Sequence, residues 1–226
     1  MSRWLRYLVL LFIGGVLLSA AIDWNTASAA NALPDPKVDE TQPAAQGSEK
    51  VVFAGGCFWG IQAVFEHVKG VTKATAGYSG GNVKNPSYED VSSGETGHAE
   101  SVQVVYDPSK ITFGQLLKVF FSVAHDPTEL NRQGPDEGTQ YRSAIFYETP
   151  GQQRIAQAYV AQLTDARAFS RPIVTQIVPF TAFYRAEDYH QDYLVAHPDN
   201  PYIMMNDFPK VSNLKKQFPA IYVSYP

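Results

Sequence analysis

Apolar and polar residues repeat with two different periods along the chain, and each period predicts its own kind of element. Short runs of β-branched or alternating apolar residues predict strands, which lie at 51–53, 71–77, 101–106, 143–147 and 173–178. Apolar residues spaced three and four apart predict helices, which lie at 58–68, 113–124, 150–167 and 186–195. Gly70 then stands where the first helix should stop.

The order of these elements is irregular, and this indicates the fold class. Two polar stretches that contain glycine, 78–97 and 128–140, are long for loops, and loops of that length are often functional. We therefore predict an α+β fold, a two-layer α/β sandwich with a mixed sheet, rather than a doubly wound parallel sheet. From 197 the chain is rich in Pro and Asn. This composition predicts a long, coil-rich C-terminal segment, with one short helix possible at 211–217.

The first 30 residues have the pattern of an export signal. Arg3 and Arg6 precede an uncharged apolar run at 8–22, and the small residues 27–29 fit a cleavage site. A spanning helix usually needs about 20 apolar residues, so a membrane anchor is the alternative. We therefore expect residues 1–30 to direct export to the periplasm or the medium, or else to hold the protein in the membrane.

The next segment, 31–49, separates this signal from the folded part of the chain. It contains prolines among Ala, Gln, Asp and Glu, and its apolar residues have no period. Such a composition predicts a disordered linker. The folded domain is then expected at 50–226.

Composition and charge exclude several classes of protein. With 226 residues, 45% of them hydrophobic and 18% charged, the chain suits one globular domain with an appendage. Its net charge is −4 and its sequence contains no run of basic residues, so we expect no nucleic-acid partner. Cys57 is the single cysteine, which excludes an internal disulfide framework and a cysteine-rich metal site. The histidines show no metal-ligand spacing, so we expect no metal.

Cys57 lies where a short buried strand turns into the first helix. Gly55 and Gly56 break the strand just before it. Free backbone N–H groups and the positive end of the helix dipole favour an anion at such a position, so we expect a lowered thiol pKa and a reactive cysteine. The alternative is a buried structural cysteine that acts as a small hydrophobe.

Five motifs in order make the sequence similar to a known family. They are GCFWG at 56–60, GYSGG at 77–81, NPSY at 85–88, GHAE at 97–100 and DEGTQYRSAI at 136–145. Together they resemble the peptide methionine sulfoxide reductases of the A type, over about residues 50–193. The resemblance implies thiol-dependent reduction of methionine S-sulfoxide, free or in proteins, and thus repair of oxidised proteins. It implies the same α+β architecture, and we expect a monomer without a cofactor.

Attack of a thiolate on a sulfoxide needs an acid or strong hydrogen-bond donors at the oxygen and an apolar slot for the methyl group. Phe58 and Trp59 are adjacent to Cys57 and could form the slot, although Phe58 also fits the core. Taken alone, Glu100 could be a solvated residue at a strand start, and Asp136 could cap a loop.

The resemblance assigns roles to these residues. It places Phe58 and Trp59 in the methyl pocket, with His190 near them as a secondary candidate. It makes Glu100 the proton donor to the sulfoxide oxygen, which requires a carboxyl group with its pKa raised towards neutral. It implies that the phenols of Tyr88 and Tyr141 donate hydrogen bonds to that oxygen. It also implies that Asp136 acts through an ordered water molecule.

The chain departs from common family patterns at two places. Gln62 stands where many relatives have glutamate, and the C-terminal region has no cysteine to resolve the oxidised Cys57 as a disulfide. We therefore expect a one-cysteine enzyme whose sulfenic acid is reduced by an external thiol, from a thioredoxin-like dithiol or a small thiol.

Two other functions remain open from the residues alone. One is a cysteine hydrolase that pairs Cys57 with a histidine such as His98 or His190. The other is an exported, non-catalytic binding protein whose single cysteine forms a covalent dimer.

Overall fold

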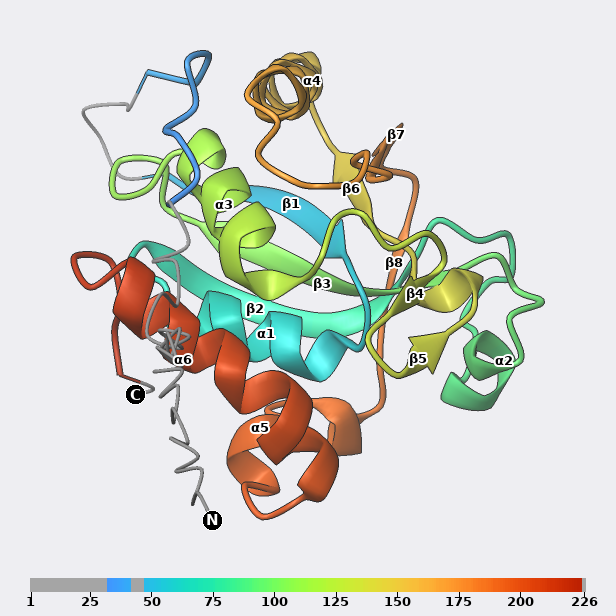
Figure 1. The fold of residues 1–226 in the computed structure, drawn as a ribbon. Coiled ribbons are helices and arrows are strands. Elements are labelled where there is room, and N and C mark those ends of the chain that lie inside the picture. The colour runs from blue at the N-terminus through green and yellow to red at the C-terminus, as the bar shows by residue number, and fades with distance from the viewer. Residues whose placement is uncertain (1–31, 42–46, 225–226) are drawn as a thin grey trace, which may run out of the picture. The chain divides into compact units, whose positions relative to one another are not determined.

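The computed structural model describes residues 32–41 and 47–224, and its centre is a mixed six-stranded sheet (Figure 1). The strand order is β7-β6-β1-β3-β2-β8. Only β6 and β7 are parallel among these neighbours. The strands are β1 (Glu49–Ala54), β2 (Val71–Ser79), β3 (Ala99–Tyr106), β6 (Ala144–Tyr147), β7 (Gln176–Pro179) and β8 (Phe183–Arg185). A separate two-stranded hairpin pairs β4 (Arg132–Gln133) with β5 (Asp136–Glu137). The predicted α+β class with a mixed sheet is confirmed.

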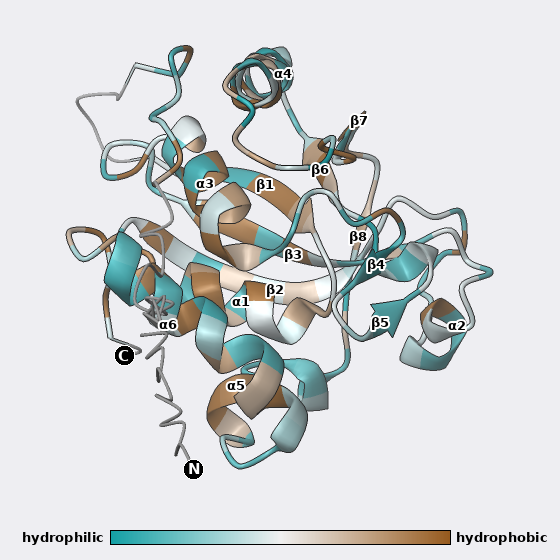
Figure 2. Ribbon diagram, viewed as in Figure 1, coloured by the Kyte–Doolittle hydropathy of each residue, from teal (hydrophilic) through white to brown (hydrophobic). Residues whose placement is uncertain are grey.

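Helices cover one face of the sheet. Successive side chains along β1 alternate between this face and the opposite face, so each face has its own apolar cluster. Val51 and Phe53 face the main core, where the Phe53 ring stacks on Phe65 and Phe120 with ring centroids 5.0 and 4.6 Å apart. Val52 faces a smaller apolar cluster on the opposite side. In Figure 2, most of β1 is brown, the helices carry both brown and teal residues, and much of α6 is teal. The helices are α1 (Phe58–Glu66), α3 (Phe113–Val119), α4 (Pro150–Asp165) and α6 (Phe208–Gln217).

Most predicted elements are present, with changes in detail. The helix expected at 113–124 begins with a capping box on Thr112, but its last turn widens into the π-helix η1 (Phe120–Ala124). The stretch at 78–97 is not entirely a loop, because Ser87 caps the short helix α2 (Tyr88–Ser92). The helix expected at 186–195 is instead two pieces, η3 (Asp188–His190) and α5 (Tyr193–Ala196).

The segment after residue 197 is more helical than its composition predicts. It contains the π-helix η4 (Ile203–Asp207), which leads directly into α6. Pro209 stands in the first turn of α6, where proline is tolerated, although the Asp207 side chain makes no capping hydrogen bond. The helix thought possible at 211–217 is the second part of α6.

Residues 32–41, part of the expected linker, pack against the folded domain. The Tyr159 phenol donates to the Pro34 carbonyl over 2.9 Å. Asp39 and Glu40 accept hydrogen bonds from the backbone N–H groups of Gly114 and Phe113, which belong to the first turn of α3. These contacts contradict the expectation of disorder for this part of the linker. The predicted export signal, 1–30, lies outside the described residues. Among the described helices none is long and apolar enough to cross a membrane.

Candidate active site

The turn between β1 and α1 places Cys57 at the N-cap of α1. Gly56 precedes it with a φ of +97°, a conformation that side chains other than glycine rarely adopt. A Cβ at Gly56 would also lie 2.5 Å from Cγ of Gln133. Gly56 therefore lets the turn pass close to the loop that carries Gln133, while Gly55 leaves room for the His125 ring.

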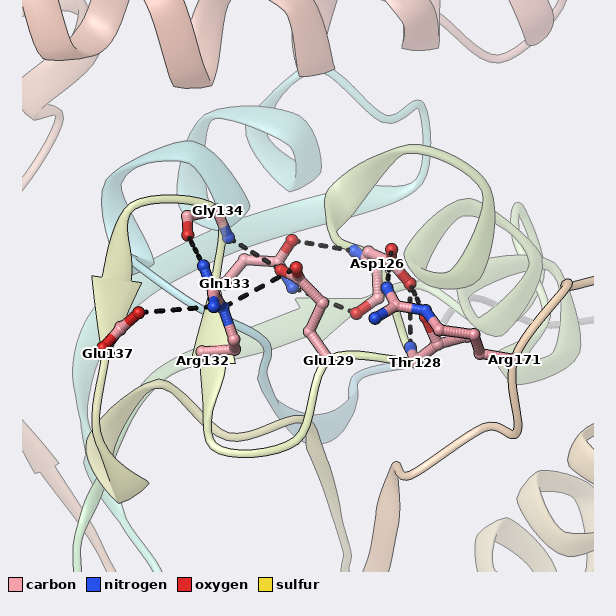
Figure 3. Close-up of polar contacts among 8 residues, drawn as sticks. All are labelled: Asp126, Thr128, Glu129, Arg132, Gln133, Gly134, Glu137 and Arg171. Carbon is pink, nitrogen blue, oxygen red and sulfur yellow. Dashed lines mark hydrogen bonds and ion pairs between the residues drawn. The ribbon is translucent and has the colours of Figure 1, made fainter.

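That loop, residues 126–137, is held by its own polar contacts (Figure 3). The Gln133 amide bonds to Asp126 twice: its oxygen accepts from the Asp126 N–H, and its Nε2 donates to the Asp126 carbonyl, over 3.0 and 3.1 Å. Ion pairs join Arg132 to Glu129 and Glu137. The loop thus presents Gln133 and the adjacent β5 to Cys57 as an ordered wall.

Cys57 is 7% exposed and opens into a pocket of about 90 Å³. Burial raises the pKa of its thiol well above the ordinary value, and the Glu100 and Asp207 carboxylates add to the rise. The Trp59 backbone N–H and the Lys210 ammonium act in the opposite direction. The expectation of a thiol pKa lowered by the helix start is therefore wrong for the protein without substrate. The pocket is lined by Cys57, Gln133, Gly134, Pro135, Asp136, Tyr202, Asn206 and Lys210.

Glu100, near the start of β3, accepts the hydrogen bond of the first N–H of α1, so this N–H is not directed to the sulfur. Its Oε2 accepts a hydrogen bond from the Phe58 N–H over 3.0 Å, and the residue is only 3% exposed. Burial raises the pKa of Glu100 to about 8, and the carboxylates of Asp136 and Asp207 contribute to the rise. The raised pKa expected for this residue is confirmed, and it makes Glu100 mostly a neutral acid at pH 7.

Phe58, Trp59 and His190 form one aromatic group beside the thiol. The Phe58 ring centroid is 5.1 Å from that of His190, and the Trp59 indole N–H donates to His190 Nδ1 over 3.1 Å. Trp59 also stacks on Tyr193 at 3.7 Å. His190 is 2% exposed, and burial lowers its pKa, so the imidazole is neutral. Its acceptor bond to Trp59 fixes the orientation of the indole.

The structure brings Tyr88, Tyr141 and Asp136 to the same site. Burial raises the pKa of both phenols, and each also responds to the charge of Glu100 and of Cys57. Asp136 lines the Cys57 pocket and accepts a hydrogen bond from the Tyr202 phenol. The other seven residues proposed from the sequence are therefore brought to the site of Cys57, on α1, α2, β3, β5, η2 (Thr139–Tyr141) and η3.

Besides the loop residues that line the pocket, four residues of the C-terminal segment that the sequence analysis did not single out also reach the site. Tyr202, Asn206 and Lys210 line the pocket, and fully buried Asp207 forms an ion pair with Lys210 over 3.1 Å. The helix-start pattern at Asp207 and Pro209 was the signal that could have placed them on an ordered element.

The histidines proposed for a hydrolase have other partners. His98 Nδ1 accepts from the Gly81 N–H over 3.1 Å, and its Nε2 bonds to the Val83 carbonyl over 2.7 Å. These bonds give His98 a part in holding the loop after β2. His190 Nδ1 is engaged by Trp59. Across residues 32–41 and 47–224, no three His, Cys, Asp or Glu side chains gather as metal ligands would.

Comparison with known proteins agrees with the geometry. A family profile described as peptide methionine sulfoxide reductase matches residues 49–221. "Peptide methionine sulfoxide reductase MsrA 2" of Mesorhizobium japonicum is 60% identical over 185 residues, covering 82% of this chain and 95% of that protein. The protein of the same name from Synechocystis is 52% identical over 188 residues, covering 82% of this chain and 88% of its own.

Two solved structures share the fold. Reduced Mxr1 of Saccharomyces cerevisiae has a TM-score of 0.63 and 33% identity, over 73% of this chain and 92% of its own. Methionine sulfoxide reductase A of Corynebacterium diphtheriae has a TM-score of 0.59 and 37% identity, over 73% of this chain and 86% of its own.

Proposed function

The chain belongs to the peptide methionine sulfoxide reductases of the A type, which reduce methionine sulfoxide with thiols. From this family membership we propose that Cys57 is the nucleophile. Its sulfur attacks the sulfur of a methionine S-sulfoxide. The single observation that carries the proposal is the pairing of Cys57 with a buried, neutral Glu100, linked through the Phe58 N–H at the start of α1. A carboxylic acid beside the thiol is what a sulfoxide requires, because its oxygen leaves poorly until it is protonated.

The proton movements follow from the two raised pKa values. Both Cys57 and Glu100 hold their protons at pH 7 in the free site. When the sulfoxide oxygen takes the Glu100 proton, the carboxylate that remains can accept the proton of the thiol. In the adduct between the two sulfurs, the S–O bond of the substrate and the bond between the sulfurs then break as the OH group passes to Cys57. Methionine leaves, and Cys57 holds the oxygen as a sulfenic acid, so that overall thiol plus sulfoxide gives sulfenic acid plus methionine.

The other residues hold the substrate. Phe58, Trp59 and His190 enclose the methyl group, since they form a joined aromatic surface with one partly buried indole–imidazole hydrogen bond. Tyr88 and Tyr141 keep their phenolic protons and donate to the sulfoxide oxygen. Asp136, fixed by the Tyr202 phenol, orders water at the mouth of the pocket.

Regeneration needs a thiol from outside the chain. Cys57 is the single cysteine in 226 residues, so its sulfenic acid has no partner within the protein. One external thiol condenses with the sulfenic acid and releases water, and a second thiol reduces the mixed disulfide. A thioredoxin-like dithiol supplies both thiols at once, and a small thiol supplies them in two encounters.

Single turnover tests this mechanism. The protein is reduced, freed of thiol and mixed with each methionine sulfoxide epimer, free and in a peptide. We expect about one methionine per enzyme from the S epimer only, with the sulfenic acid of Cys57 trapped by a dimedone-type reagent. No methionine from either epimer, with Cys57 still a free thiol, would disprove the reductase mechanism and favour the hydrolase.

We propose that the protein acts outside the cytoplasm. The support is the sequence pattern of residues 1–30, with two arginines before an uncharged apolar run. Cell fractionation, with mass spectrometry of the mature N-terminus, tests this. Cleavage after residue 29 or 30 would show export, an intact leader in membranes would show the anchored form, and an intact leader in the cytoplasm would contradict both.

A further inference from the structure

The ion pair between Asp207 and Lys210 lies beside Cys57 and has no part in the steps above. Lys210 Nζ is 3.1 Å from Asp207 Oδ1, and the two side chains are 16% and 0% exposed. Lys210 and Cys57 line the same pocket of about 90 Å³. Because removing two charges from water is costly, a buried ion pair is weak evidence for a purely stabilising role.

Packing against α1 shows how directly the pair meets the turn that carries the thiol. Gly60 lies one helical turn after Cys57. A Cβ at Gly60 would overlap Asp207 Oδ1 and would lie 2.8 Å from Lys210 Nζ. The glycine that ends the GCFWG motif therefore makes room for this ion pair on the first turn of α1.

Most of the charged groups around the Cys57 sulfur are acidic and disfavour its thiolate, so a cation is required to stabilise that form. Glu100 from β3 and Asp207 from η4 disfavour the thiolate, whereas Lys210 from α6 favours it. Oδ2 of Asp207 has no hydrogen-bond donor within the described part of the chain, so Lys210 is the group that compensates this carboxylate. The remaining titratable groups that face the pocket or the sulfur are acidic: Asp136, Tyr88, Tyr141 and Tyr202.

We infer that Lys210 is a positioning residue for the reaction at Cys57: its ammonium, held by Asp207 over Gly60, stabilises the anionic sulfur that attacks the sulfoxide. The inference deepens the proposed function, because it names the cation that favours the nucleophilic form. Lys210 thereby supplies part of what the sequence analysis expected from the helix start, whose first N–H is bonded to Glu100.

The rate of Cys57 alkylation by iodoacetamide, measured in the full chain as a function of pH, tests this role. Alkylation reports the thiolate directly. Lys210→Met and Lys210→Gln should each move the midpoint of the profile up by about one pH unit and slow alkylation about tenfold at pH 8. Lys210→Arg keeps the charge and should stay close to the original profile. Lys216, an exposed lysine on the same helix, provides the matched control in Lys216→Met.

An unchanged profile in both neutral Lys210 variants would overturn the inference, and so would an equal shift in Lys216→Met. A shift in Lys210→Arg as large as in Lys210→Met would show that packing, not charge, is responsible. Circular dichroism checks that each variant is folded. If either Lys210→Met or Lys210→Gln fails to fold, the other neutral variant still tests the inference. Since alkylation uses no sulfoxide, failure here is distinct from failure of the single-turnover test.

Discussion

Strand β3 has a buried carboxyl group near each end, and the two groups have opposite acid–base behaviour. Glu100 lies near the start of the strand and Asp107 directly follows its last residue, and each is 3% exposed. The pKa of Glu100 is raised to about 8, whereas that of Asp107 is lowered to about 2. Both carboxyl groups have little contact with solvent, but Glu100 lies deep in the protein and Asp107 lies close to its surface, and their pKa values move in opposite directions.

The difference lies first in the depth of burial, which is the largest cause of the raised Glu100 pKa, and then in the donors that each carboxylate receives. Asp107 Oδ1 accepts from the Ser109 hydroxyl and N–H over 2.6 and 3.0 Å, and Lys110 Nζ lies 3.2 Å from its Oδ2. Glu100 accepts from the Phe58 N–H and faces the carboxylates of Asp136 and Asp207. Hydrogen bonds and cations favour the charged form, while burial and like charges favour the neutral form. The active-site end of β3 produces an acid because the carboxyl group is deeply buried there and receives few donors.

Changing Glu100 to Gln should give the largest effect, because it removes the proton and keeps the shape. The single-turnover rate of methionine formation should fall by about 10²- to 10⁴-fold. Asp107→Asn is the matched control on the same strand, and its rate should stay close to that of the unchanged protein. Equal losses in the two variants would mean that the two ends of β3 do not differ in catalytic role.

The two carboxyl groups should also affect stability with opposite dependence on pH. Since folded Glu100 titrates near 8 and the unfolded group near 4.5, the folded state binds more protons between these values. Glu100 therefore stabilises the fold least above pH 8, and the free energy of unfolding should fall by on the order of a few kcal/mol from pH 4.5 to 8.

Urea unfolding at several pH values, with and without Glu100→Gln, measures this slope. The variant should be less sensitive to pH across that window. Asp107 has a lowered folded pKa, so its contribution is present above pH 3.8 and is lost as the pH falls towards 2. An identical slope in Glu100→Gln would show that Glu100 is charged in the folded state at neutral pH.

Removal of one phenol should have a smaller effect, because two of them face Glu100. Tyr88→Phe and Tyr141→Phe should each reduce the single-turnover rate about tenfold, and the double variant more. Tyr189→Phe, which changes an exposed phenol, is the control. If the double variant turns over normally, the sulfoxide oxygen is held by Glu100 and water alone.

Asp107→Asn should have the smallest effect, on stability only. It replaces a charged acceptor at the end of β3, so the hydrogen bonds from Ser109 weaken and the ion pair with Lys110 is lost. We expect a Tm lower by about 2–6 °C, measured by differential scanning calorimetry. Lys110→Met should lower Tm by less, since the Ser109 bonds remain. A Tm that is unchanged in both variants would show that the Asp107 carboxylate contributes nothing to the stability of the fold.

Much of the fold could be predicted from the sequence because the signals are local. The alternation in 101–106 and the capping box at Thr112 predicted β3 and the start of α3 at nearly the observed positions. The resemblance identified most of the aromatic and acidic residues that gather at Cys57 from α1 to η3, but not the loop residues Gln133, Gly134 and Pro135 that also line its pocket. The C-terminal segment was harder, since its Pro and Asn content hid a helix whose stability comes from packing on α1 rather than from its own composition.

The sequence by itself determined the single cysteine, its place between a strand and a helix, and the motif residues that accompany it. Only the tertiary structure decided the state of the thiol and the identity of its charged neighbours. The Phe58 N–H meets a carboxylate 42 positions away, and Trp59 meets His190 131 positions away. A pKa depends on burial and on charges within a few ångströms, so it is a property of groups that only the folded chain brings together.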